Sequence, residues 1–132
     1  MEIPVAVRTF LDERRFGVLA TVNPDGTPQQ TVMWFTLHGD TIMMNTAQGR
    51  VKASNLRNDP RVSICVEDEY TYVTAFGRAE LIDDQEVAQR DIAELAVRYN
   101  GADRAQSQIA EFRKQTRITI LVPIERLISS GL

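Results

Sequence analysis

Apolar residues near the start of the chain recur at the spacing of a helix. The positions that share one helical face are Ile3, Val7, Phe10 and Leu11. Their i, i+4, i+7 and i+8 spacing is typical of an amphipathic helix, and a charged cluster before Gly17 ends it. The pattern therefore predicts a short helix over residues 3–13 that packs its apolar face on a sheet.

The chain then reads as strands separated by turns. Apolar and β-branched residues run together or alternate with polar ones at 16–22, 27–37, 41–45, 61–67, 70–82 and 117–128. Asn23-Pro-Asp-Gly26 and His38-Gly-Asp40 have the residue types of tight turns. Gly77 stands near the middle of the fifth strand, where a bulge or bend would let the sheet curl.

Three further helices are predicted between these strands. A short one ends at Asn58-Asp-Pro60, because proline cannot continue the helical hydrogen-bond ladder. Asp83 and Glu86 match an N-cap and capping-box pair for a longer helix that ends at Asn100-Gly101. A weaker helical pattern covers 103–115.

This order of elements does not alternate strand and helix as a parallel fold would. Six strands joined by turns or brief helices predict a mainly β fold, a six-stranded antiparallel barrel with flanking helices. Side chains fill the interior of a small barrel, so a ligand is expected outside it or at a subunit interface. The 132 residues leave room for one domain, residues 1–132.

Composition narrows the classes of function. A net charge of −3 supplies no basic field for nucleic acid. Cys65 is the only cysteine, so neither an internal disulfide nor a cysteine-based zinc cluster can form. Met1 to Arg8 lacks a signal-peptide pattern, and no apolar run reaches the roughly 18 residues of a membrane span. We therefore expect a cytoplasmic protein without nucleic-acid, membrane or metal partners.

Two cations stand where a helix disfavours them. Arg50 and Lys52 fall in the first turn of the short helix, where the dipole is positive and backbone N–H groups lack partners. A phosphate would account for both residues by accepting from the free amides and from the two side chains. The alternative is a solvated basic turn, which costs only a few tenths of a kcal/mol.

The other reactive residue types favour structural interpretations. His38, the only histidine, lies in a turn and is expected to be solvated rather than to act as an acid or base. Cys65 alternates with apolar residues and is expected to pack as a small hydrophobe. Trp34 can fill a core or subunit interface, or stack on a ligand ring, and both interpretations stay open. Arg57 and Arg61 are expected to be surface charges, and no catalytic residue is predicted.

Several segments carry a resemblance to a known family. They are Gly17-Val-Leu-Ala-Thr-Val22, Asp25-Gly-Thr-Pro-Gln29, Arg50-Val-Lys-Ala-Ser-Asn-Leu-Arg-Asn-Asp-Pro-Arg-Val-Ser-Ile64, Tyr70-Thr-Tyr72 with Gly77-Arg-Ala-Glu-Leu81, and Arg117-Ile-Thr-Ile120. In these segments the chain resembles the pyridoxamine 5'-phosphate oxidase-like, FMN-binding split-barrel family, and within it the group that binds coenzyme F420, an 8-hydroxy-5-deazaflavin. The resemblance implies a homodimeric split barrel with cofactor sites at the subunit interface. It also implies an oxidoreductase that transfers a hydride between the deazaflavin and a small conjugated organic substrate.

The same resemblance implies cofactor contacts along the chain. The basic pair at the helix start would grip the phosphate, the two residues that end the preceding strand would contact the ribityl chain, and the strand after the first turn would run along the ring. Two tyrosines of the partner subunit would face that ring. The implied cofactor-binding residues are Pro28, Gln29, Val32, Thr46, Ala47, Arg50, Val51, Lys52, Asn55, Tyr70 and Tyr72.

Two alternatives share these binding features. FMN also presents a phosphate and a ring, so an FMN-binding oxidase or reductase would use the same cations. A non-catalytic carrier of deazaflavin, flavin or haem would use them without turnover. Vitamin B6 oxidation is disfavoured, because the extra basic residues that grip the substrate phosphate in true pyridoxamine phosphate oxidases have no counterpart in this sequence.

Overall fold

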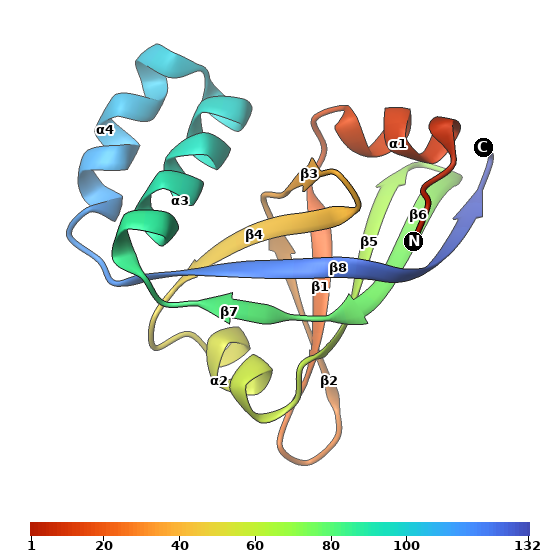
Figure 1. Cartoon of the computed structure of the whole chain (residues 1–132), viewed down its shortest axis with the longest axis horizontal. Coiled ribbons are helices and arrows are strands. Elements are labelled where there is room, and N and C mark those ends of the chain that lie inside the picture. The colour runs from red at the N-terminus through yellow and green to blue at the C-terminus, as the bar shows by residue number, and fades with distance from the viewer.

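A computed structural model describes residues 1–132 and contains eight strands and four helices (Figure 1). The elements follow in the order α1 (Val5–Asp12), β1 (Gly17–Val22), β2 (Pro28–Met33), β3 (Thr36–His38), β4 (Thr41–Ala47), α2 (Val51–Asn58), β5 (Arg61–Asp68), β6 (Thr71–Arg78), β7 (Glu80–Ile82), α3 (Gln85–Asn100), α4 (Ala102–Phe112) and β8 (Arg117–Ser130). The mainly β class with flanking helices is confirmed.

The expected number of six strands is wrong, because two of the predicted strands each divide. The strand expected over 27–37 breaks between β2 and β3, where the N–H group of Phe35 donates to the hydroxyl of Tyr99 instead of a neighbouring strand. The strand expected over 70–82 becomes β6 and β7. A register shift between Phe76 and Gly77 marks the bend that the glycine predicted, and a Cβ at Gly77 would collide with the carbonyl oxygen of Pro123.

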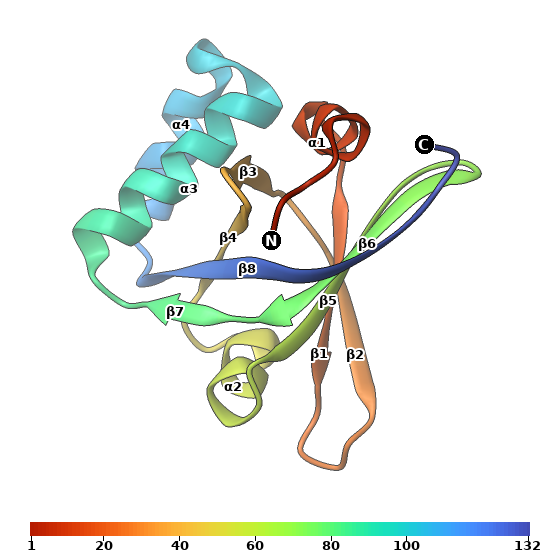
Figure 2. The same cartoon turned by 45° about the vertical axis from the view of Figure 1, so that its right-hand side comes forward.

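All strand pairings are antiparallel, in the order β2-β1-β5-β6-β8-β4-β3, with β7 also paired to β8. The long strand β8 joins the two halves of the curled sheet. Its first half pairs with β4 and β7, and its second half pairs with β6. Figures 1 and 2 show β8 crossing the molecule while the β1–β2 hairpin projects to one side.

The concave side of this sheet holds the main core. Its buried residues come from every strand except β7 and from α1 and α2, as the fully buried Leu11, Leu19 and Ile120 illustrate. The predicted helical face is confirmed, since Val7, Phe10 and Leu11 are the buried residues of α1. Met33, Met43 and Met44 are buried as well.

The helices α3 and α4 form a hairpin that packs against β4 and β8 (Figure 1). Asp84, rather than the expected Asp83, caps α3, because its carboxylate accepts from the N–H groups of Glu86 and Val87. Asp83 instead forms an ion pair with Arg57 at 2.6 Å. The hairpin turns at Gly101, whose φ of 83° favours glycine. None of the helices has the length and apolar character needed to span a membrane.

Candidate functional site

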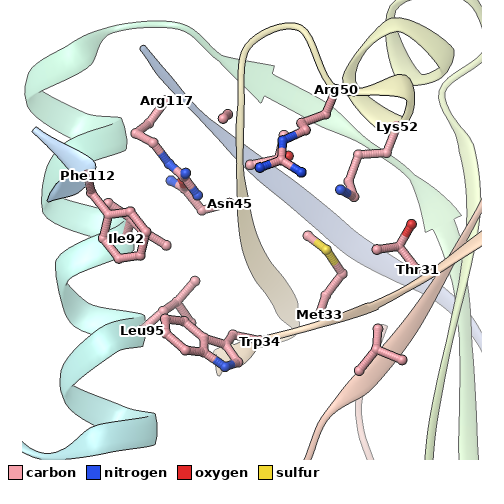
Figure 3. Close-up of a pocket in the computed structure, with 13 residues that line it drawn as sticks. Thr31, Met33, Trp34, Asn45, Arg50, Lys52, Ile92, Leu95, Phe112 and Arg117 are labelled. Carbon is pink, nitrogen blue, oxygen red and sulfur yellow. The ribbon is translucent and has the colours of Figure 1, made fainter. Parts of the chain in front are cut away.

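A pocket of about 450 Å³ lies where the end of β2, the end of β4, the start of α2 and the α3–α4 hairpin meet (Figure 3). Cationic side chains occupy part of its wall and apolar side chains occupy the rest. The lining residues are Thr31, Val32, Met33, Trp34, Asn45, Thr46, Ala47, Arg50, Lys52, Ile92, Leu95, Phe112 and Arg117.

Arg50 and Lys52 enter this pocket from the start of α2. Arg50 is the N-cap residue and has an extended backbone, and the first turn contains no side-chain cap and no acidic residue. Both side chains point into the pocket (Figure 3), and neither forms a hydrogen bond or ion pair with another residue. The positive end of the helix and two unpaired cations therefore face the same space, which suits an anion.

The electrostatics of Lys52 support the same conclusion. Burial lowers the pKa of its ammonium group, and the positive charges of Arg50 and Arg117 lower it further. No carboxylate among the lining residues offsets these charges. An anion in the pocket would raise the pKa of Lys52 again, because an opposite charge favours the protonated form.

Local contacts fix the position of α2. The chain leaves β4, turns at Gly49, where φ is 92°, and is held there by the N–H group of Gln48, which donates to the carbonyl oxygen of Thr116 at 2.8 Å. Asn55 is a buried residue of α2 and donates from Nδ2 to Oγ1 of Thr21 at 3.0 Å and to Oδ1 of Asn23 at 2.9 Å. The segment before α2 is thereby tied to the residue that precedes β8, and the helix itself is tied to the first hairpin.

Arg117, a third cation in the pocket, was not assigned a role from the sequence. It is buried at the start of β8, where Nε donates to Oδ1 of Asn45 at 2.9 Å and Nη1 donates to Oε1 of Gln115 at 2.6 Å. Burial, and then the charge of Arg50, lower the pKa of Arg117 to about 10, so its guanidinium stays protonated at neutral pH. The sequence signal that could have pointed to Arg117 was its position directly before the alternating apolar residues of the last strand.

The apolar part of the wall comes largely from the helical hairpin. Ile92 and Leu95 of α3 and Phe112 of α4 face Trp34 across this end of the pocket (Figure 3). The ring of Trp34 stacks on Tyr99 at 5.2 Å and meets the edge of Phe112 at 6.5 Å. Trp34 thus packs in an aromatic cluster and also lines the pocket. Sequence periodicity placed the α3 residues on a helix but could not show which cavity they line.

The structure brings part of the predicted cofactor-binding set together. The members that line the pocket are Val32, Thr46, Ala47, Arg50 and Lys52. Val51 lies between the two cations in sequence and is exposed, whereas Asn55 is buried on the inner face of α2. Pro28 and Gln29 lie at the start of β2, outside the pocket, and the side chain of Gln29 contacts those of Thr21 and Thr31. Their contact with a cofactor stays a prediction.

Tyr70 and Tyr72 lie away from this pocket. Tyr70 lies in the turn between β5 and β6, and Tyr72 lies near the start of β6. Both are at the opposite end of the sheet from α2 (Figure 2). Tyr70 is 92% exposed and Tyr72 is 37% exposed. Within one chain they cannot reach the pocket, so their predicted role requires a second subunit.

The remaining polar candidates lie outside the pocket. His38 is exposed, as expected, and its Nε2 lies 2.7 Å from Oε2 of Glu94. Cys65 is half-buried on β5 rather than fully buried. Arg57 pairs with Asp83 and Arg61 pairs with Asp59, which confirms both as surface charges.

The family of this chain follows from a sequence match over most of its length. The sequence pattern of the family described as pyridoxamine 5'-phosphate oxidase matches residues 3–122. The chain belongs to this family. The resemblance that the sequence motifs suggested is therefore confirmed.

Solved structures agree with this assignment. A structure described as an F420 reductase is 29% identical, with a TM-score of 0.78, and the match covers 96% of this chain and 98% of that one. A conserved hypothetical protein from Mycobacterium tuberculosis is also 29% identical, with a TM-score of 0.83 and coverage of 98% and 84%. General stress protein 26 from Bacillus anthracis, at 16% identity and a TM-score of 0.67 over 92% and 88% of the two chains, shows the fold alone.

Proposed function

We propose that the chain is a coenzyme F420-dependent oxidoreductase that transfers a hydride between the deazaflavin and a small conjugated organic substrate. The observation that carries the proposal is the position of Arg50 and Lys52, which are unpaired at the amino end of α2 and point into the pocket. The donor set fits a phosphate-bearing cofactor, because free helix amides and two cations converge without a carboxylate to neutralise them.

Each element of the site has a distinct task in this proposal. Arg50 can bind the phosphate through two donors at once, whereas Lys52 contributes a compact point charge. Thr46 and Ala47, at the end of β4, would line the ribityl chain. When bound, the deazaflavin supplies the hydride chemistry, and the protein contributes position, orientation and exclusion of water.

The strand β2 offers a surface for the ring. It pairs only with β1 and is an edge strand of the sheet, so one side of its backbone has free donors and acceptors. Val32 on this strand lines the pocket and is 62% exposed. Pro28, Gln29 and Val32 would therefore meet the ring or its edge, although only Val32 reaches the pocket.

The proposal includes a homodimer. Within one chain Val32 is exposed on β2, where the cofactor ring would lie, and Tyr70 and Tyr72 are exposed at the other end of the sheet. In a symmetric dimer each subunit can present this hairpin to the pocket of its partner. Cross-linking or sedimentation of the purified protein, with and without cofactor, tests the dimer separately from catalysis.

FMN is the alternative cofactor, since the family name describes an oxidase and the same cations suit either phosphate. The deciding experiment titrates cofactor-free protein with coenzyme F420 and with FMN side by side. We expect tighter binding of coenzyme F420, followed by loss of reduced-cofactor signal when a conjugated acceptor is added. Preferential retention of FMN would reject the deazaflavin, and tight binding without turnover over a broad set of acceptors would indicate a carrier.

A further inference from the structure

Arg117 carries a positive charge that no residue in the chain neutralises. The side chain lines the pocket, is only 7% exposed, and forms no ion pair. Asp91, a buried carboxylate near this region, is already paired with Arg90 at 3.2 Å. A buried charge without a partner costs free energy, so its retention here calls for an anion.

A hydrogen-bond network around Asn45 holds the guanidinium of Arg117 in place. Asn45 accepts from Nε of Arg117 through Oδ1, and its own Nδ2 donates to the carbonyl oxygen of Ala88 at 2.9 Å. The same Nδ2 lies 3.3 Å from Oγ1 of Thr119, which donates to Oδ2 of Asp91 at 2.8 Å. This connected polar network leaves Arg117 little freedom to turn away from the pocket.

One nitrogen of Arg117 remains available to a ligand. Nε is used by Asn45 and Nη1 by Gln115, whereas Nη2 forms no hydrogen bond within the chain. The ring of Phe112 covers the guanidinium, with 4.8 Å between the ring centroid and Cζ. Arginine with a free donor and a fixed plane is well suited to bind a carboxylate.

The surroundings of Arg117 differ from those of the other two cations. Arg50 and Lys52 reach the pocket from α2, beside the free amides of the helix. Arg117 instead stands beside Phe112 and Ile92 on the side of the α3–α4 hairpin, with Leu95 further along the same wall (Figure 3). An anion bound here would therefore have an apolar body next to its charge.

We propose that Arg117 binds the carboxylate of an organic acid whose apolar part packs on Ile92, Leu95 and Phe112. This carboxylate position is separate from the phosphate position at Arg50 and Lys52. Where the acid is the hydride acceptor, the inference rests on the proposed function and narrows its substrate class to conjugated carboxylic acids. A carboxylate on the cofactor itself presents the same chemistry.

The test uses two simple ligands and needs no cofactor. Cofactor-free protein is titrated calorimetrically with trans-cinnamate, a conjugated acid, and with inorganic phosphate. We expect Arg117→Gln to weaken cinnamate binding by about tenfold or more, in line with the loss of one charge-assisted contact, while phosphate affinity falls by clearly less, because the Arg117 charge acts on that position only from a distance. Arg50→Ala is the matched control and should show the reverse pattern, and the uncharged amide of cinnamate should bind more weakly than the acid.

A measurement on the unaltered protein guards against a variant that does not fold. In nitrogen-edited NMR spectra, cinnamate should shift the Nε–H signal of Arg117, and phosphate should shift backbone signals at Val51 and Lys52. Equal loss of phosphate and cinnamate binding in Arg117→Gln, or unchanged cinnamate binding, would overturn the proposal. Failure to bind coenzyme F420 would refute the proposed function and leave this result standing.

The source of the carboxylate is resolved with the folded Arg117→Gln variant. Coenzyme F420 carries carboxylates beyond its phosphate, whereas FMN carries none. Weaker binding of coenzyme F420 with unchanged FMN affinity assigns the carboxylate to the cofactor. Unchanged affinity for both cofactors, together with lost cinnamate binding, assigns it to a second molecule.

Discussion

The hydroxyl of Tyr99 accepts a hydrogen bond from the backbone N–H group of Phe35 at 3.0 Å. The same hydroxyl has two acceptors within reach, the carbonyl oxygens of Arg15 at 2.5 Å and of Phe35 at 3.1 Å. One α3 side chain therefore joins the break between β2 and β3 to the loop before β1. Because Trp34 stacks on the ring of Tyr99, this contact also supports the pocket wall.

Replacing Tyr99 by phenylalanine should remove this junction while keeping the ring. The N–H group of Phe35 would be buried without a partner, so we expect the free energy of unfolding to fall by about 1–3 kcal/mol in urea titrations. Tyr70→Phe is the matched control, because that hydroxyl is on a 92% exposed residue and makes no hydrogen bond in the chain. Equal stability of the two variants would contradict the junction.

Asn55 should matter for the position of α2. Asn55→Ala leaves Thr21 and Asn23 without their donor and is expected to lower the free energy of unfolding by about 1–3 kcal/mol. Phosphate affinity should fall too, because α2, which carries the phosphate position at its start, loses its anchor to the first hairpin. Asn58→Ala, at an exposed site on the same helix, should change neither quantity measurably.

Lys52 and Arg50 should contribute differently to cofactor binding. Lys52→Ala is expected to weaken the binding of coenzyme F420 by about tenfold or more, as the loss of a contact worth about 1.5–3 kcal/mol implies. Arg50→Lys keeps the charge but loses the two-donor geometry, so a weaker but measurable affinity should remain. Fluorescence titration measures both, with Arg57→Ala on the same helix as the control. Unchanged affinity in Lys52→Ala would reject the phosphate site.

The lowered pKa of Lys52 predicts a pH dependence of stability in the absence of ligand. Between the pKa of the folded chain and the usual lysine pKa of 10.5, the unfolded chain binds more protons, so the Lys52 contribution to stability rises with pH. Lys52→Met removes a charge that the helix dipole disfavours. We expect this variant to exceed the unaltered protein in stability by about 0.3–1 kcal/mol at neutral pH, and less as the pH approaches 10.5.

Urea unfolding over a pH series measures this difference directly. Lys114→Met is the control, because Lys114 is exposed and pairs with Glu111 on the surface at 3.0 Å. Added phosphate should reverse the order, because it stabilises the protein that retains Lys52 more than the variant. A Lys52→Met variant that is less stable without ligand at every pH would show that the ammonium group is not strained in the free pocket.

The alternation of apolar and polar residues determined most of the elements. The helical face of Val7, Phe10 and Leu11, the bend at Gly77 and the end of α3 at Gly101 follow from local chemistry, and each is found in the structure. The cations at the start of α2 were also visible in the sequence, because helix dipole and capping preferences are local and a violation of them can be recognised without a fold.

Tertiary structure decided the rest. The strand β2 ends before Phe35, whose N–H group donates to Tyr99, a residue 64 positions away, and no local pattern encodes that competition for a backbone donor. The same holds for Arg117, whose burial and unpaired charge arise where β8 meets Asn45 of β4 and Phe112 of α4. The sequence by itself thus predicted an anion at Arg50 and Lys52, because helix-end electrostatics act within one turn. Only the folded chain decided that a third cation and an apolar wall complete the pocket, because their residues meet through long-range packing.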